Sequence, residues 1–219
     1  MSKSIKFYFD ILSPYSYFGF EGLTKNKNAW KTSVELKPFL LGAIVKKSEN
    51  KGMPLMNPAK TKYVIKDLTF MAQYWGIPFR VPKNYVELML TTSSAVPQRV
   101  LAASKLRDGE AEMENLTSKL GHLFWAYGKP IFTEEQIQEV LRYSQYPNHE
   151  ELFQLSKSSE VKEMLKKNTQ EALDQGCFGA PWTHIVDNSS GNVIQAVFGS
   201  DRLPQIANFV GEKFNNSSA

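Results

Sequence analysis

The most informative stretch of this chain is Asp10-Ile11-Leu12-Ser13-Pro14-Tyr15-Ser16-Tyr17-Phe18-Gly19. It follows the apolar run Ile5 to Phe9, which predicts a buried strand, and it opens a predicted helix from Pro14 to about Lys27. Proline suits the first helical position because its missing N–H costs nothing there. The unpaired N–H groups of such a helix start favour an anion beside Ser13, and serine is also an ordinary helix cap. The two roles are compatible, and both stay open.

Further along the chain, the apolar pattern predicts a strand, a long helical stretch, two strands and a closing helix. Their ranges are 34–39, 59 to about 175, 183–187, 193–198 and 202 to about 213. This order, β-α-β, a helical stretch and then β-β-α, resembles a thioredoxin fold with an insertion. We therefore predict an α/β protein whose thioredoxin-like domain, residues 1–58 and 176–219, is interrupted by a large all-helical insertion, residues 59–175.

A thioredoxin-type chain carries a Cys-x-x-Cys redox pair where the first strand meets the first helix. Here Ser13 and Ser16 occupy both positions, so the site has no sulfur of its own for thiol–disulfide exchange. Sulfur chemistry then needs a thiol from outside, for which glutathione is the candidate. The Ser13 hydroxyl could donate a hydrogen bond to that thiol in its thiolate form. Lowering a thiol pKa by roughly two units from about 8.5 takes only about 3 kcal/mol, which a hydroxyl and a helix dipole can supply. Ser16 has the weaker claim, because its side chain is expected to bond locally, and Tyr15 either covers a ligand or packs.

Two more segments meet Ser13 in such a fold. Phe178-Gly179-Ala180-Pro181 precedes a predicted strand, and a proline there is typically cis, which exposes the Ala180 backbone to pair with an extended peptide such as glutathione. Ser200 and Asp201 stand at the start of the last helix. A hydroxyl at a helix start suits a carboxylate and an aspartate suits an ammonium group, so the pair suits a γ-glutamyl end. A plain turn proline and ordinary helix caps are the alternatives.

The composition limits the class of protein. The net charge of +4, from 26 basic and 22 acidic residues without an arginine-rich run, is too mild to indicate nucleic-acid binding. The single cysteine, Cys177, excludes an intrachain disulfide and a cysteine-based zinc site, and a lone thiol is typical of a reducing compartment. No apolar run approaches a membrane span, and the N-terminus has no signal-peptide pattern. We expect an intracellular protein without membrane or nucleic-acid partners.

Several other side chains are weaker candidates. We expect the three histidines to be packed or exposed rather than catalytic, and Cys177 to be a buried filler rather than a nucleophile. Lys60 and Lys62 either meet the glycyl carboxylate of glutathione or belong to a solvated helix start. Core packing is preferred over an electrophile pocket for four aromatic residues. These are Trp75, Trp125, Tyr127 and Phe132.

The segments 7–16, 178–181 and 198–202 are similar to kappa-class glutathione transferases, in the superfamily of disulfide oxidoreductases and 2-hydroxychromene-2-carboxylate isomerases. The similarity extends over nearly the full chain, including the loop Ser48-Glu49-Asn50-Lys51. It implies a glutathione site composed of Ser13, Pro14, Tyr15, Asn50, Ala180, Pro181, Ser200 and Asp201. In that site Ser13 is the catalytic residue, Ala180 pairs with the cysteinyl part, and the last two residues hold the γ-glutamyl end.

The resemblance implies glutathione conjugation to small electrophiles, reduction of hydroperoxides as a second activity, and thus a role in detoxification. It also implies a homodimer in mitochondria or peroxisomes, with glutathione as co-substrate and no metal or other cofactor; the termini leave the cytoplasm open as well.

Two alternatives stay open: a glutathione-dependent isomerase of the same superfamily, and a non-enzymatic folding or assembly protein. The chain departs from the family at Tyr17 and Ala180, where tryptophan and leucine are common, which puts the electrophile preference in doubt.

Overall fold

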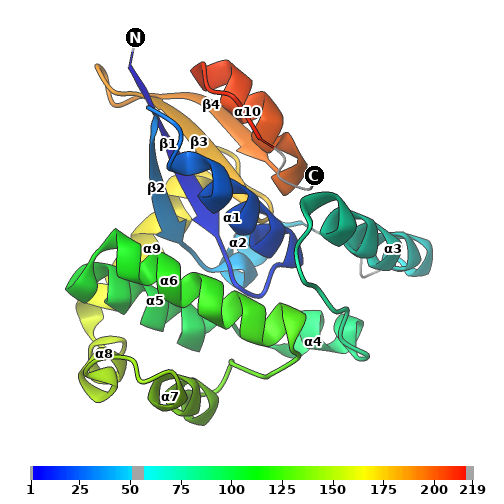
Figure 1. Cartoon of the computed structure of the whole chain (residues 1–219), viewed down its shortest axis with the longest axis vertical. Coiled ribbons are helices and arrows are strands. Elements are labelled where there is room, and N and C mark those ends of the chain that lie inside the picture. The colour runs from blue at the N-terminus through cyan, green and yellow to red at the C-terminus, as the bar shows by residue number, and fades with distance from the viewer. Residues whose placement is uncertain (1, 51–56, 216–219) are drawn as a thin grey trace.

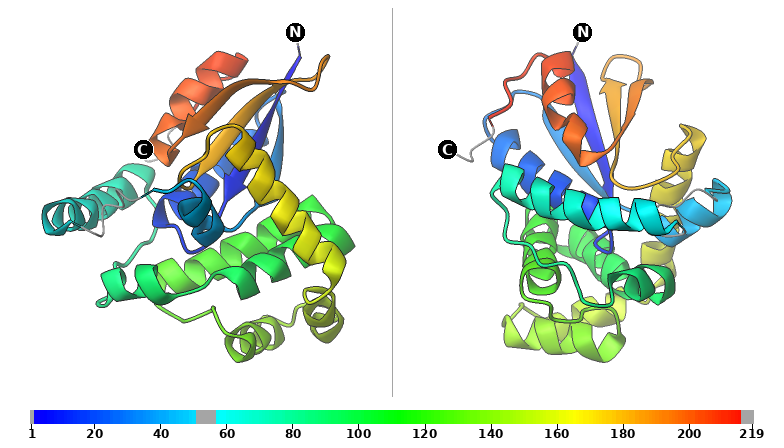
Figure 2. Two further views of the ribbon diagram at one scale, coloured as in Figure 1. Left: turned by 180° about the vertical axis from the view of Figure 1, so that it is seen from behind. Right: turned by 90° about the vertical axis from the view of Figure 1, so that its right-hand side faces the viewer.

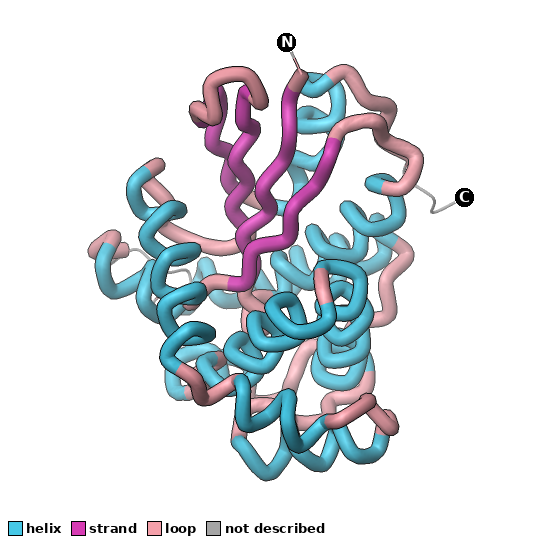
Figure 3. The backbone as a smooth tube through the Cα atoms, turned by 90° about the vertical axis from the view of Figure 1, so that its left-hand side faces the viewer, coloured by secondary structure: helices cyan, strands magenta, loops and turns pink. Residues whose placement is uncertain are grey.

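A mixed four-stranded sheet organises the computed structural model, which describes residues 2–50 and 57–215 (Figure 1). The strands are β1 (Lys3–Phe9), β2 (Ser33–Pro38), β3 (Trp182–Asp187) and β4 (Val193–Phe198), in the order β2-β1-β3-β4. β1 runs parallel to β2 and antiparallel to β3, and β3 pairs antiparallel with β4. Figure 3 shows the four strands side by side, with most of the helices below them. The thioredoxin-like arrangement predicted for the chain is confirmed.

Alternation along β1 sends its side chains to two different cores. Ile5, Phe7 and Phe9 are buried against α1 (Pro14–Lys27) and α10 (Leu203–Val210). Tyr8 points to the other face, where it packs with residues of α2 (Leu41–Lys47) and α9 (Ser159–Asp174). In the left view of Figure 2, which looks at the molecule of Figure 1 from behind, α9 lies in front of the sheet. The sheet is therefore a central layer, and β1 lies inside it.

The helical insertion lies at the end of the sheet where β1 and β2 finish (Figure 1). It comprises α3 (Pro58–Trp75), α4 (Tyr85–Thr91), α5 (Ala95–Asp108), α6 (Glu110–Gly121) with a π-helical extension (His122–Ala126), α7 (Glu134–Tyr143) and α8 (His149–Leu155) before α9. Residues 57–181, all of them described, contain no strand, as the periodicity predicts. The exact domain boundaries at 58/59 and 175/176 stay a prediction. α9 belongs to the predicted insertion yet packs on the sheet.

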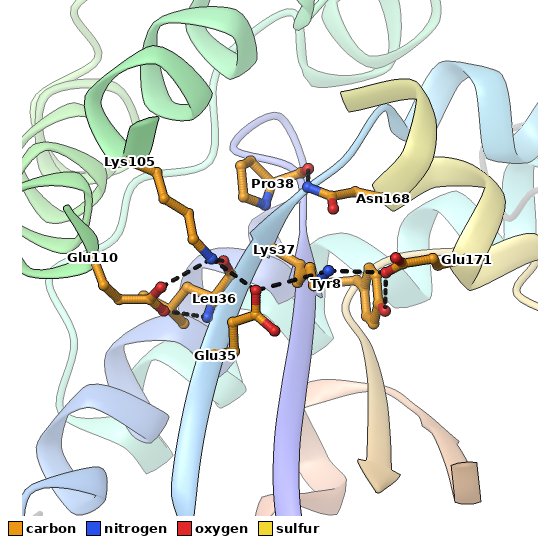
Figure 4. A network of polar contacts seen from close by, with 9 residues as sticks. All are labelled: Tyr8, Glu35, Leu36, Lys37, Pro38, Lys105, Glu110, Asn168 and Glu171. Carbon is orange, nitrogen blue, oxygen red and sulfur yellow. Dashed lines mark hydrogen bonds and ion pairs between the residues drawn. The ribbon is translucent and has the colours of Figure 1, made fainter. Parts of the chain in front are cut away.

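Side chains from the insertion cover the open edge of β2 (Figure 4). The Leu36 N–H donates to Glu110, and Lys105 Nζ donates to the Leu36 carbonyl at 2.8 Å. Asn168 Nδ2 donates to the Pro38 carbonyl, also at 2.8 Å. Because an unpaired strand edge invites pairing with another chain, these bonds protect the sheet as well as anchor the insertion.

Two details differ from the sequence prediction, and one predicted residue is not described. The helix α2 was not predicted, because seven residues are too short to show a helical period. The last helix ends at Val210 rather than near Lys213, because Gly211 adopts a left-handed conformation with φ +83° and stops it. Lys51, part of the loop that resembles the kappa class, lies outside the described residues.

Candidate functional site

Ser13 is the N-cap of α1, a few residues after the end of β1. Its N–H donates to the Asp10 carbonyl at 2.9 Å, and its Oγ accepts from the Ser16 N–H at 3.1 Å. Pro14 occupies the first turn of the helix, as expected from its sequence position. The capping interpretation is therefore confirmed. It leaves the Ser13 proton available for a second partner, because the cap uses only a lone pair of the hydroxyl oxygen.

A buried carboxylate holds the turn that carries Ser13. Asp10 is fully buried, and it accepts hydrogen bonds from the Leu12 N–H at 2.9 Å, the Leu41 N–H at 2.8 Å and the Ser94 hydroxyl at 2.6 Å. Burial raises the pKa of Asp10, while these three bonds favour its charged form. The carboxylate thus ties the Ser13 turn to the starts of α2 and α5. The sequence analysis gave Asp10 no role, although an acid directly after a buried strand was a signal for one.

The insertion fixes the same turn through two more side chains. Trp125 Nε1 donates to the Ile11 carbonyl at 2.9 Å. Gln98, which is fully buried on α5, donates to the carbonyls of Phe9 at 2.8 Å and Phe39 at 2.7 Å. The ends of β1 and β2 are therefore pinned from the helical side, which keeps Ser13 at a constant position relative to the sheet.

The segment Phe178–Pro181 lies against Ser13. The Ala180–Pro181 peptide bond is cis, as predicted, and the Ser13 hydroxyl donates to the Ala180 carbonyl at 3.2 Å. Asn50 reaches the same segment, since its Nδ2 donates to the Phe178 carbonyl at 2.9 Å. Three predicted site residues, Ser13, Asn50 and Ala180, thus meet at one segment although they lie far apart in the chain.

Ser200 and Pro181 both lie against α1, at Gly19. The Gly199 N–H donates to the Pro181 carbonyl at 3.1 Å. A Cβ atom on Gly19 would lie 3.3 Å from side-chain carbons of both Pro181 and Ser200, so only glycine permits this approach comfortably. Ser200 is 1% exposed, and its Oγ finds no hydrogen-bond partner among the described residues. A buried hydroxyl without a partner is costly, so an acceptor that reached it would be stabilised.

The remaining candidate residues make their contacts away from the segment Phe178–Pro181. Asp201 is exposed, with its Oδ2 3.4 Å from Arg202 Nε, and its carboxylate faces solvent where a cation can meet it. The Tyr15 hydroxyl donates to Asp67 of α3 at 2.7 Å, so its ring packs toward α3. Ser16 bonds locally, accepting from the Asp10 N–H at 3.4 Å, as expected.

The weaker candidates are either packed in the interior or exposed to solvent, and the expectation of core packing is wrong for Tyr127, which is 70% exposed. Cys177 is buried, which raises the pKa of its thiol to about 12, and it donates to the Gly179 carbonyl. Burial lowers the pKa of His184 to about 4, and Trp75 and Trp125 belong to the core. Lys60 is exposed and Lys62 largely so on the first turns of α3, as a solvated helix start predicts. Within residues 2–50 and 57–215, no group of three His, Cys, Asp or Glu side chains could hold a metal, and no helix there is long and apolar enough to cross a membrane.

An apolar cavity of about 450 Å³ opens beside Leu12, the neighbour of Ser13. The walls come from the starts of α2 and α5 and from the end of α4. They are Leu40, Leu41, Gly42, Ala43, Val45, Met89, Leu90, Thr92, Ser93, Ser94 and Ala95. The sequence analysis did not find this cavity, because its walls come from residue 12 and the segments 40–45 and 89–95, which only the fold brings together.

Comparisons with known proteins identify the family of this chain. The DsbA-like thioredoxin domain family matches residues 4–211. Glutathione S-transferase kappa 2 of Caenorhabditis elegans is 56% identical over 97% of this chain and 93% of its own length. Human glutathione S-transferase kappa 1 is 31% identical over 98% of this chain and 93% of its own length.

Among solved structures, 2-hydroxychromene-2-carboxylate isomerase is similar in fold, with a TM-score of 0.74 and 22% identity, covering 94% of each chain. At that identity the likeness concerns the fold alone, whereas the two transferases align at higher identity over nearly the whole chain. The chain therefore belongs to the kappa-class glutathione S-transferases, within the DsbA-like thioredoxin domain family.

Proposed function

We propose that this protein transfers glutathione to small electrophiles and that Ser13 holds the reacting sulfur as a thiolate. One observation carries the proposal. The Ser13 hydroxyl, at the start of a 14-residue helix, directly contacts the residue before the cis proline. The helix start favours an anion, and the segment around Ala180 offers backbone to a peptide. A peptide that carries a thiol satisfies both.

The mechanism follows from these positions. The cysteinyl backbone pairs with Ala180, which places its sulfur at Ser13, and the γ-glutamyl end reaches Ser200 and Asp201. The thiol proton leaves to water, and the Ser13 hydroxyl donates its own proton to the thiolate in a hydrogen bond. The sulfur then attacks an electrophilic carbon, so that a C–S bond forms and the leaving group departs with its electron pair.

The buried Ser200 hydroxyl supports the glutamyl end of this arrangement. It is unpartnered among the described residues, and the preceding residue, Gly199, donates its N–H to Pro181. A carboxylate there gives the hydroxyl the acceptor it lacks. The exposed carboxylate of Asp201 accepts the α-ammonium group of the same ligand.

The electrophile is proposed to bind in the apolar cavity beside Leu12. Its walls are mainly Leu, Val, Met and Ala side chains, which suits a small apolar substrate. Gly42 lines the cavity, and a Cβ atom on it would meet nothing within 4 Å, so Gly42→Phe has room to enter the space. We expect that variant to raise KM for an apolar aryl halide about tenfold and to leave the KM for glutathione unchanged, because the phenylalanine ring occupies the space that the electrophile needs. Gly42→Ala is the matched control, and an unchanged KM for the aryl halide in Gly42→Phe would place the electrophile elsewhere.

Three finer features of the proposal come from family membership. We propose a homodimer, a mitochondrial or peroxisomal location, and catalysis with glutathione as co-substrate and no resident metal or cofactor. Sedimentation of the purified protein tests the dimer, and cell fractionation tests the location. Activity that survives exhaustive treatment with chelators tests the third feature.

The central experiment is a pH titration of glutathione thiolate absorbance in the presence of the protein. Bound glutathione is expected to ionise about two pH units below its free value, and Ser13→Ala is expected to abolish that shift. Ser16→Ala is the matched control, because it removes a neighbouring hydroxyl that bonds the Asp10 N–H instead. If glutathione ionises as it does in free solution, the transferase proposal fails. If substrate is rearranged without consumption of glutathione, the isomerase alternative replaces it.

A further inference from the structure

The three consecutive carbonyls of the segment Phe178–Ala180 each accept a hydrogen bond from a side chain. Asn50 donates to Phe178 at 2.9 Å, Cys177 to Gly179 at 3.2 Å, and Ser13 to Ala180 at 3.2 Å. Two of these donors, Ser13 and Asn50, are residues that the kappa-class resemblance places in the glutathione site. Both donate to the very segment with which the ligand is to pair.

The Ser13 hydroxyl has only one proton, and that proton is engaged. Its oxygen already accepts from the Ser16 N–H at 3.1 Å, so the proton that points to the Ala180 carbonyl is its only means of stabilising a thiolate. Ala180 is 7% exposed and Ser13 is 3% exposed, so little water is available to replace the bond. If the hydroxyl turns to a sulfur, the Ala180 carbonyl loses a buried donor, which carries a substantial penalty.

We propose that the Ala180 carbonyl is a specificity-determining group, which releases the Ser13 hydroxyl to a thiol only when an amide N–H on that thiol's own residue takes its place. The proposal rests on the proposed function, because it needs Ser13 to act on the sulfur. A cysteinyl residue with an acylated nitrogen carries such an N–H two carbons from its sulfur, and it would pair with Ala180 as a neighbouring strand does. The substrate class is therefore acylated cysteinyl thiols, and a thiol without that N–H is bound unactivated.

Protons balance in this exchange. The thiol proton goes to water, the Ser13 hydroxyl keeps its proton and turns it from the Ala180 oxygen to the sulfur, and the cysteinyl N–H donates to the Ala180 oxygen. No group on the protein changes its protonation state. The segment therefore selects the substrate by its backbone rather than by a side-chain pocket.

The test compares glutathione with its depsipeptide analogue, in which an ester oxygen replaces the cysteinyl N–H. For each thiol, kcat/KM is measured with native protein and with Ser13→Ala, using one chromogenic aryl halide at a fixed concentration. The value of kcat/KM is measured below saturation. Weaker binding of the analogue therefore lowers kcat/KM by the same factor in native protein and in Ser13→Ala. We expect Ser13→Ala to lower kcat/KM at least tenfold with glutathione and less than twofold with the analogue.

N-acetylcysteamine and 2-mercaptoethyl acetate repeat the comparison without the γ-glutamyl and glycyl ends, since they also differ by this N–H. An equal loss with both members of a pair overturns the inference while Ser13 activation stands. If Ser13→Ala lowers kcat/KM with neither glutathione nor the analogue, the proposed function itself is overturned. The two failures are therefore distinguishable.

Discussion

At the scale of single residues, Ser200 is expected to affect folding and glutathione binding in opposite directions. Its hydroxyl is buried and has no partner among the described residues, so the ligand-free protein bears an unpaired polar group. We expect Ser200→Ala to leave the free energy of unfolding unchanged or to raise it by up to about 1 kcal/mol, because that group is removed. The same change is expected to weaken glutathione binding about tenfold or more, because a hydrogen bond to a carboxylate is lost.

Urea unfolding of the ligand-free protein and calorimetric titration with glutathione measure these two effects of Ser200→Ala separately. A loss of stability together with unchanged affinity would show that the hydroxyl serves the fold and not the ligand.

Gly19 determines how closely α1 approaches the site. A Cβ there would lie 3.0 Å from the Phe7 ring and 3.3 Å from carbons of Pro181 and Ser200. We expect Gly19→Ala to cost about 1–3 kcal/mol of unfolding free energy and to raise the Kd for glutathione several-fold, because α1 must move away from both contacts. Gly42→Ala is the control, because nothing lies within 4 Å of its Cβ. Unchanged affinity in Gly19→Ala would mean that this approach does not shape the site.

At the level of secondary structure, the edge of β2 depends on charged side chains from the insertion. Lys105 Nζ bonds the Leu36 carbonyl at 2.8 Å and lies 3.1 Å from Glu35 and 2.9 Å from Glu110 (Figure 4). We expect Lys105→Met to cost about 2–3 kcal/mol, because it leaves two carboxylates and a carbonyl without their shared donor. Thermal or urea unfolding measures the loss.

A matched comparison is Lys166→Met on α9. The Lys166–Glu163 pair is highly exposed on both sides, at 71% and 69%, so its loss is expected to cost less than about 0.5 kcal/mol. Equal effects of the two substitutions would show that the β2 edge gains nothing from Lys105.

The pH dependence of folding belongs to the whole molecule, because His184 lies in the middle of the sheet. Burial first, and then the nearby charge of Lys6, lowers the pKa of His184 to about 4, against about 6.5 in an unfolded chain. Between these values the unfolded chain binds a proton that the folded protein does not, so stability falls as the pH falls from about 6.5 toward about 4. The expected loss from this group is at most about 3 kcal/mol.

Urea unfolding at several pH values, with native protein and with His184→Leu, measures that contribution. The variant is expected to flatten the slope between about pH 4 and about pH 6.5. A slope that is identical in native protein and in His184→Leu would assign the acid sensitivity to other groups.

Patterns between neighbouring residues were sufficient to predict much of this protein. Strand alternation predicted β1, helical periodicity predicted most of the insertion, and Ser13-Pro14 predicted the start of α1, because periods and caps depend on residues a few positions apart. Short or interrupted elements were predicted poorly, and α2 and the end of α10 are examples. The sequence by itself therefore determined the class of fold and, through the resemblance, the family.

The tertiary structure determined how the candidate site is assembled. The contacts of Ser13 with Ala180, of Asp10 with Ser94 and of Gly19 with Ser200 join residues that lie far apart in the chain. No local pattern contains them, because each depends on the packing of the insertion and of both ends of the chain around one sheet. The engaged proton of Ser13 and the unpartnered hydroxyl of Ser200 have the same origin, since burial and hydrogen bonding become defined only when distant segments meet.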